Sequence, residues 1–225
     1  MDWSPILISM RTAGLSIVFT FFMGILAAWM VVRISHPLMK TILDGIFTIP
    51  LVLPPTVAGF FLLLIFSTRR TVGSYLYTTF DIKIVQSWAG CVIAAIVIAF
   101  PLMYRNARAA FEQVDVNLIY AAQTLGMPEW KIFWRVIMPA AGPGVASGTI
   151  LAFARALGEY GATSMLAGNI PGKTATISQR IAMVIQDGDY QTAGVWVGIV
   201  ILIAFGIVVL MNLAFGKGMK HTKQW

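Results

Sequence analysis

The chain alternates long uncharged apolar stretches with short polar segments, and every charged residue lies in the polar segments. A membrane-spanning helix needs about 20 apolar residues. Five stretches meet this requirement: residues 13–32, 45–66, 84–104, 136–154 and 193–215. The pattern predicts an all-α protein in which residues 1–225 form one domain, a polytopic transmembrane helical bundle of about five spans.

The second stretch contains three closely spaced prolines, Pro50, Pro54 and Pro55, followed by Thr56. Proline lacks the backbone N–H of a helical hydrogen bond, so we expect the helix to bend or unwind here. Irregular backbone at membrane depth is tolerated only where it is buried in protein or lines a water-filled cavity. The cluster therefore predicts a packing kink, a pathway wall, or both.

Residues 115–139, between the third and fourth stretches, are too polar to cross a bilayer. Gly126 stands where a left-handed residue would end a helix, and Pro128 suits the first turn of a second one. Before Gly126, apolar residues recur at the spacing of one helix face, namely Leu118, Ala121, Ala122 and Leu125. The segment predicts short helices on the membrane surface over residues 117–135, built to bind a partner.

The composition excludes several functions. The chain is 58% hydrophobic and 11% charged, whereas soluble domains are about a quarter charged, so we expect the lipid bilayer to contact much of the surface. Lys and Arg cluster at the ends of apolar stretches and form no stripe with aromatics, which argues against nucleic acid. Cys91, His36 and His221 are isolated. We expect no catalytic set, no metal and no cofactor bound by this chain.

The basic residues also predict an orientation. The first stretch lacks the basic leader of a cleaved signal peptide, so we expect it to be retained. With the N-terminus outside, the outer side holds Arg11, Arg69, Arg70, Lys83, Lys173 and Arg180, with Arg155 at a span end. The inner side then holds more: Arg33, Lys40, Arg105, Arg108, Lys131, Arg135, Lys217, Lys220 and Lys223. This topology places the C-terminus and residues 117–135 in the cytoplasm.

Charged and hydroxyl side chains near the spans are candidates for a transport pathway. Arg155 and Glu159 are i, i+4 neighbours and can pair on one helix face. We interpret them as a structural ion pair or as a direct substrate contact, since charges at a membrane boundary usually face protein or water. Hydroxyls that could line a polar path are Thr48, Thr56, Ser87, Ser147 and Thr149.

Residues 158–191 contain too few consecutive apolar residues to span the membrane. We expect a short helix or a re-entrant turn here, beside the outer opening of the transport pathway. The segment could serve as a gate, a docking surface or a plain loop. Within it, Gly168 to Thr174 looks like a phosphate-binding loop but has three residues between its glycines, where the motif needs four. We therefore expect ATP to bind another chain.

The surface segment resembles a known signature. Ala121-Ala122, Gly126, Ile137 and Pro139 match the spacing of the "EAA" signature of bacterial ABC-importer permeases, although Tyr120 stands where the signature has glutamate. Further segments closely resemble those of molybdate permeases, and sulfate and tungstate permeases are near relatives that these segments do not cleanly separate. The resemblance covers most of the chain and includes residues 50–55, 153–163 and 168–174.

The resemblance implies a MetI-like ABC-importer permease fold in the bacterial cytoplasmic (inner) membrane. It also implies partners: two copies of an ABC ATPase subunit that docks on residues 117–135, a second copy of this chain, and a periplasmic or extracellular oxyanion-binding protein. The implied cargo is an oxyanion, foremost molybdate, with sulfate, thiosulfate or tungstate as alternatives. A secondary transporter usually shows internal repeats and intramembrane charges, and a membrane enzyme needs paired ionisable groups in its spans. The sequence shows none of these.

Overall fold

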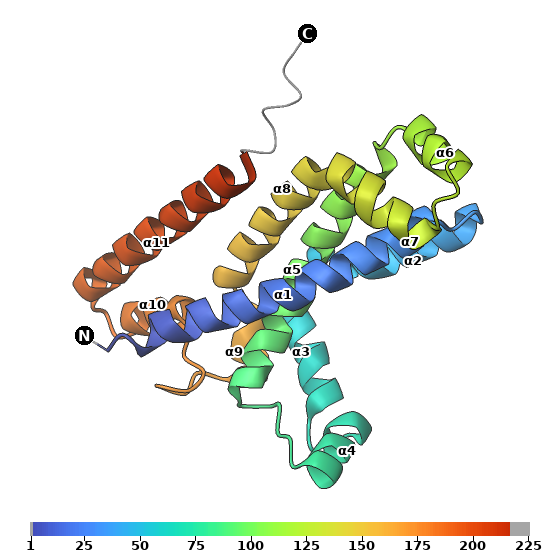
Figure 1. Cartoon of the computed structure of the whole chain (residues 1–225). Coiled ribbons are helices and arrows are strands. Elements are labelled where there is room, and N and C mark those ends of the chain that lie inside the picture. Colours follow the sequence, from blue (N-terminus) through green and yellow to red (C-terminus); the bar gives the residue numbers. More distant parts are fainter. Residues whose placement is uncertain (1, 217–225) are drawn as a thin grey trace.

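The computed structural model of the chain describes residues 2–216. Within this range the chain is helical, and the helices form one elongated bundle (Figure 1). In chain order the elements are α1 (Ser4–Val32), α2 (Pro37–Val52), α3 (Pro55–Phe66), α4 (Thr71–Phe80), α5 (Trp88–Glu112), α6 (Val116–Thr124), α7 (Glu129–Ile132), the π-helical turn η1 (Phe133–Ile137), α8 (Met138–Leu157), α9 (Gly161–Ala167), α10 (Ile177–Gln186) and α11 (Tyr190–Gly216). The predicted inner-side residues Lys217, Lys220 and Lys223, and also His221, lie outside the described residues.

The core of the bundle consists of α5 packed between α1 and α8. Small residues let these helices approach closely. A Cβ placed on Gly144 would lie 2.5 Å from the Cβ of Ala110, and one on Gly24 would lie 2.6 Å from Met103 Cγ. Ala28 and Ala99, in the same core, have no exposed surface. The alanines and glycines of the apolar stretches therefore mark packing faces as well as membrane-spanning residues.

Four helical runs are long and apolar enough to cross a membrane: Ser4–Val32, Trp88–Glu112, Glu129–Leu157 and Tyr190–Met211. A fifth candidate is the bent pair of α2 and α3, a broken span or a re-entrant loop, whose halves meet at 109°. The prediction of about five spans is confirmed. The helix breaks at the prolines as expected, and it begins earlier than residue 45, since α2 begins at Pro37. Pro54 and Pro55 have no N–H to continue the hydrogen-bond ladder, so the helix stops there.

The first helix begins at Ser4, well before the predicted residue 13. The second surface helix leads directly into the fourth span, since α7, η1 and α8 run on from Glu129 to Leu157 as one helical segment. The short helix expected within residues 158–191 is present twice, as α9 and α10. α10 lies near the start of α1, whereas α9 packs against α3 and α5 (Figure 1).

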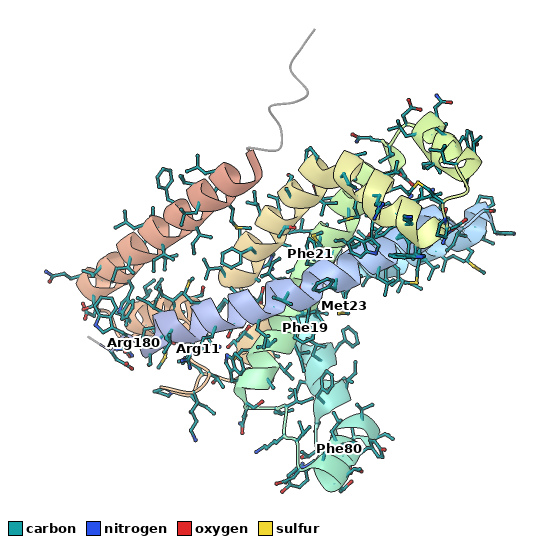
Figure 2. All side chains as sticks on the ribbon, in the orientation of Figure 1. Arg11, Phe19, Phe21, Met23, Phe80 and Arg180 are labelled. Atoms are coloured by element: carbon teal, nitrogen blue, oxygen red, sulfur yellow. The ribbon has the colours of Figure 1, made fainter. Side chains whose placement is uncertain are left out.

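The bundle has two different ends. At one end α6 and α7 lie beside the end of α1, and at the other lie the N-terminus and α10 (Figure 1). Large apolar side chains project from the sides between these ends, among them Phe19 and Met23 of α1, which are 49% and 50% exposed (Figure 2). The span of α11 is almost entirely unburied. This surface suits contact with lipid or with another subunit, as the low charge content predicted.

Candidate translocation groove and coupling segment

The surface segment has local structure that follows from its sequence. The Asp115 carboxylate caps α6 by accepting a hydrogen bond from the Asn117 N–H at 2.9 Å. Gly126 adopts φ +70°, the left-handed conformation that ends a helix and that glycine adopts without strain. Only one of the apolar residues of α6 is buried, Ala122, whereas Leu118 is 50% and Leu125 is 80% exposed. The segment therefore presents apolar side chains away from the rest of its own chain.

The same segment is attached to the spans through aromatic and charged contacts. Glu129 forms an ion pair with Arg33, whose guanidinium lies 4.7 Å from the ring centroid of Trp29. Phe133, in the π-helical turn, packs 4.9 Å from Trp29 and 5.7 Å from Phe111 between ring centroids. A displacement of α6 and α7 would therefore reach α1 and α5 directly. π-Helical turns occur often at functional positions.

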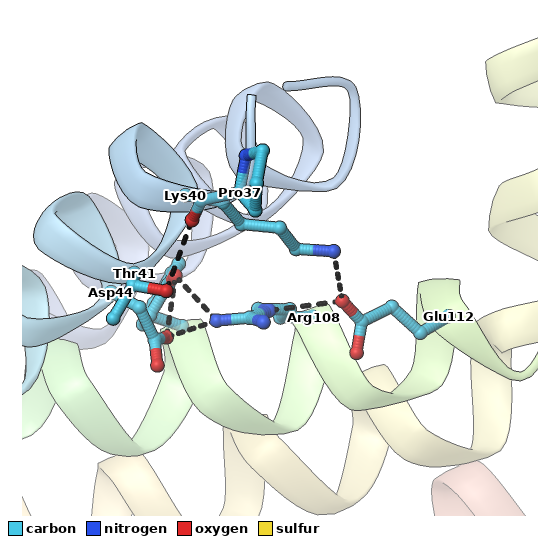
Figure 3. A network of polar contacts seen from close by, with 7 residues as sticks. Pro37, Lys40, Thr41, Asp44, Arg108 and Glu112 are labelled. Atoms are coloured by element: carbon cyan, nitrogen blue, oxygen red, sulfur yellow. Dashed lines mark hydrogen bonds and ion pairs between the residues drawn. The ribbon is translucent and has the colours of Figure 1, made fainter. Parts of the chain in front are cut away.

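A charged network ties the first half of the broken span to α5 (Figure 3). The Lys40 ammonium lies 2.9 Å from Glu112 Oε1, and Arg108 Nε donates to the same oxygen at 3.1 Å. Arg108 also pairs with Asp44, which accepts a hydrogen bond from the Tyr104 hydroxyl at 2.9 Å. The sequence reasoning missed this network. Its only local signal was the i, i+4 spacing of Arg108 and Glu112.

Arg155 and Glu159 lie next to the break in the second span. Arg155 Nη1 donates to Glu159 Oε2 at 2.6 Å, while Glu159 Oε1 accepts from the Ala162 N–H at 2.7 Å. The Glu159 side chain is 2% exposed. A Cβ on Gly161 would lie 3.0 Å from the Cβ of Pro55. The structure thus brings together the proline cluster and the charged pair, which are about a hundred positions apart in the sequence.

An open hollow of about 370 Å³ lies between α5 and α8. Ser147 lines it together with residues that the sequence did not single out, including Asn106, Ala109 and Gln113. Those three lie on one face at the end of α5, just beyond the predicted apolar stretch 84–104. The hollow is a groove along one side of this chain.

The other hydroxyl candidates are placed differently. Thr149 is buried and donates to the Val145 carbonyl at 2.8 Å, so it does not line this groove. Ser87 caps the start of α5 by accepting from the Gly90 N–H at 3.3 Å. Thr48 lies on α2, and its buried hydroxyl has no hydrogen-bond partner among the described residues. Thr56 is exposed in the first turn of α3.

The described part of the chain contains no group of three or more His, Cys, Asp or Glu that could hold a metal ion. The candidate features of residues 2–216 are a bent span, a polar groove, a charged network and an exposed surface segment. Comparison with known proteins identifies the class of the protein.

Residues 20–215 match the family described as "Binding-protein-dependent transport system inner membrane component", and the chain belongs to this family. It is 44% identical to the molybdenum transport system permease protein ModB of Escherichia coli K12, over 82% of this chain and 80% of the relative. It is 40% identical to the putative molybdenum transport system permease protein YvgM of Bacillus subtilis, over 90% and 89%. The sulfate transport system permease protein CysT of E. coli K12 is 32% identical, over 93% and 76%.

Solved structures confirm the ABC-importer permease fold. A bacterial ABC transporter that imports the acidic polysaccharide alginate superposes with a TM-score of 0.75 at 19% identity, covering 95% of this chain and 78% of that one. The MetNI methionine transporter in an inward-facing conformation gives 0.70 at 15% identity, covering 98% and 95%. The fold and family place the chain in the inner membrane as a multi-pass protein.

Proposed function

We propose that the chain is the permease subunit of an ABC importer that carries molybdate into the cell. The observation that carries this proposal is the 44% identity with a molybdenum permease over 82% of the chain. The groove between α5 and α8 suits the role, because it offers neutral hydrogen-bonding groups from Asn106, Gln113 and Ser147 and no acid. A conducting site must bind its ion weakly enough to release it.

The energetics require a motor outside this chain. A dianion entering against an inside-negative potential of about 100 mV costs about 4.6 kcal/mol, twice the value per charge. A roughly thousandfold accumulation adds about 4 kcal/mol. Since the total cost of import is about 9 kcal/mol, the dianion would flow out of the cell if its movement were passive. ATP hydrolysis by a partner subunit supplies the difference, and the permease itself carries out no chemistry.

The coupling runs through the surface segment. Two ATPase subunits dock on α6 and α7 of two copies of this chain, and contact the exposed Leu118 and Leu125. Closure of the ATPases on ATP pulls the segments together, and Arg33–Glu129 and the Phe133 cluster transmit the displacement to α1 and α5. The pathway then opens outward to a binding protein loaded with the oxyanion. In this arrangement the N-terminus is outside and the C-terminus is cytoplasmic.

Two roles are assigned to the region around the break. The bend at Pro50, Pro54 and Pro55 brings Thr56 to the boundary of the pathway. The Arg155–Glu159 pair, whose carboxylate is buried, holds α9 against the start of α3, so it supports the wall and does not contact the cargo. Ala121, Ala122, Gly126 and Pro128 shape the docking segment by setting where α6 ends and α7 begins.

Sulfate is the second candidate cargo, because the sulfate permease is 32% identical over 93% of the chain. The test uses proteoliposomes that contain the permease, its ATPase and its binding protein. Uptake of molybdate is measured with a hundredfold excess of sulfate, thiosulfate or tungstate. A hundredfold preference for molybdate corresponds to a difference in binding free energy of about 2.7 kcal/mol. We expect sulfate not to compete. Competition by sulfate at equal concentration would reassign the cargo.

A further inference from the structure

Two adjoining hollows lie on the open side of α5. One is the groove already described, between α5 and α8. The other has a volume of about 220 Å³ and is lined by Asp44, Arg105, Arg108, Ala109 and Glu112. Ala109 lines both, so the hollows meet at a residue whose side chain is a single methyl group. Arg105 therefore lies one helical turn from the point where the two meet.

Arg105 differs from the other charged residues of the second hollow because its charge is not neutralised. Arg108 pairs with both Asp44 and Glu112, and Lys40 also pairs with Glu112. Within residues 2–216, Arg105 forms no ion pair and its side chain is exposed. The region therefore has three cationic side chains and only two carboxylates. Within the described part of the chain, the unpaired cation of this region is Arg105, which lines the smaller hollow.

The surroundings also favour an anion. The larger hollow contains no carboxylate among its lining residues. The two carboxylates of the smaller hollow are engaged by Arg108 and Lys40, which reduces the repulsion that they would exert on a passing anion. An arginine offers N–H groups in a planar fork that fits two oxygens of an oxyanion at once. Openness to water keeps such binding weak, and weak binding is what passage requires.

We propose that Arg105 is a transient binding site for a tetrahedral oxyanion at the end of the groove that lies away from α6 and α7, since Arg105 precedes every residue of α5 that lines the groove. The site rests on the proposed function, since it receives the oxyanion that the groove conducts. The Arg105 guanidinium and the neutral groups of Asn106 and Ser147 contact the anion in succession along α5. This gives one residue of the chain a direct contact with the cargo, which the coupling segment and the Arg155–Glu159 pair do not make.

Chemical labelling tests binding without relying on transport. Phenylglyoxal modifies exposed arginines, and mass spectrometry measures the rate at each one in the purified complex. Molybdate at about twice its dissociation constant slows labelling about threefold at the site that it occupies. We expect this protection at Arg105 and none at Arg70, an exposed arginine beyond α3 that serves as the internal control. Chloride at equal ionic strength should protect neither.

The labelling is repeated in nanodiscs with neutral or anionic lipid, because a lipid phosphate has similar chemistry. Protection by molybdate in both supports the site. Protection by anionic lipid alone overturns it and assigns Arg105 to the bilayer. An unchanged labelling rate at Arg105 at molybdate concentrations up to tens of millimolar, where weak sites of about 10 mM fill, also overturns it.

Transport variants separate this inference from the proposed function. Arg105→Gln should lower the oxyanion imported per ATP hydrolysed about tenfold, the effect of losing about one charge-assisted hydrogen bond. Arg105→Lys should retain more activity, and Arg70→Gln, with the same loss of charge, should behave as wild type. Equal transport by Arg105→Gln and wild type would overturn the site. If the wild-type complex imports no oxyanion, the proposed function fails, while the labelling result still decides whether Arg105 binds one.

Discussion

Gly59 of α3 and Ala162 of α9 are in direct backbone contact, since a Cβ placed on Gly59 would lie 2.7 Å from the Cα of Ala162. The contact joins the second half of the broken span to the short helix that follows the Arg155–Glu159 pair. Glu159 accepts a hydrogen bond from the N–H of that same Ala162. The bend at the prolines and the buried charge are therefore parts of one packed unit.

Substitution of Gly59 tests this unit. Gly59→Val places atoms where the Ala162 backbone already lies, and overpacking of this kind costs about 1–3 kcal/mol. We expect a lower midpoint of thermal unfolding in detergent. Gly45→Val is the control, because nothing lies within 4 Å of a Cβ at that position. Equal midpoints for the two variants would show that α3 and α9 separate freely.

The Glu159 side chain distinguishes a structural pair from a cargo contact. Glu159→Gln keeps an oxygen that can accept from Ala162 but loses the charge paired with Arg155. Glu159→Ala loses both and leaves a buried N–H without a partner, at a cost of about 1–3 kcal/mol. We expect the midpoint of thermal unfolding to be highest for the wild type, lower for Glu159→Gln and lowest for Glu159→Ala. Oxyanion uptake should decrease in the same order. A Glu159→Gln protein of native stability with altered anion selectivity would instead assign the pair to the cargo.

The charged network predicts how firmly α2 is held on α5. Glu112→Lys should free α2, and hydrogen exchange of residues 37–52 should accelerate severalfold, because partly exposed ion pairs contribute up to about 1 kcal/mol each. The double variant Lys40→Glu with Glu112→Lys restores the first of the pairs and should recover part of the protection. Lys83→Glu, a charge reversal outside the network, should leave exchange unchanged. Exchange that does not respond to Glu112→Lys would mean that apolar packing alone holds α2.

We predict that the exposed Leu125 side chain contributes to the affinity of the permease for the ATPase subunit. Burial of a leucine side chain contributes about 1.5–3 kcal/mol, so Leu125→Asp should weaken ATPase association more than about tenfold. Gly126→Pro should do the same, since proline is fixed near φ −65° and Gly126 adopts +70°. Leu125→Met is the control. Copurification of the ATPase measures the effect, and undiminished recovery with both Leu125→Asp and Gly126→Pro would exclude α6 from docking.

Local rules predicted much of this molecule from its sequence. The apolar stretches gave about five crossings, Gly126 ended its helix in the left-handed conformation, and the prolines bent the second span. Each of these features depends on residues adjacent in the chain. Arg155 and Glu159 formed their pair for the same reason, because i, i+4 spacing brings them together on one helix.

The features that depend on distant residues could not be predicted in this way. The contact of Gly161 with Pro55 joins segments about a hundred positions apart, and neither segment contains a sequence signal that predicts its contact with the other. Thr149 was a pathway candidate because a hydroxyl can line a polar path, and only the packing shows that its side chain is buried. Arg105 was recognised from the sequence as a basic residue near a span end. Its exposure beside a groove emerges only when Asp44 and Glu112 are seen to engage Arg108.

The most direct test of an ATP-driven conduit is oxyanion uptake into sealed vesicles under two energy sources. Vesicles containing the permease, its ATPase and its binding protein are supplied with molybdate and either ATP or a proton gradient alone. We predict accumulation with ATP, loss of accumulation in Leu125→Asp, and none with the gradient alone. Accumulation that persists on the gradient after ATP is removed would contradict the account and make the chain a secondary transporter.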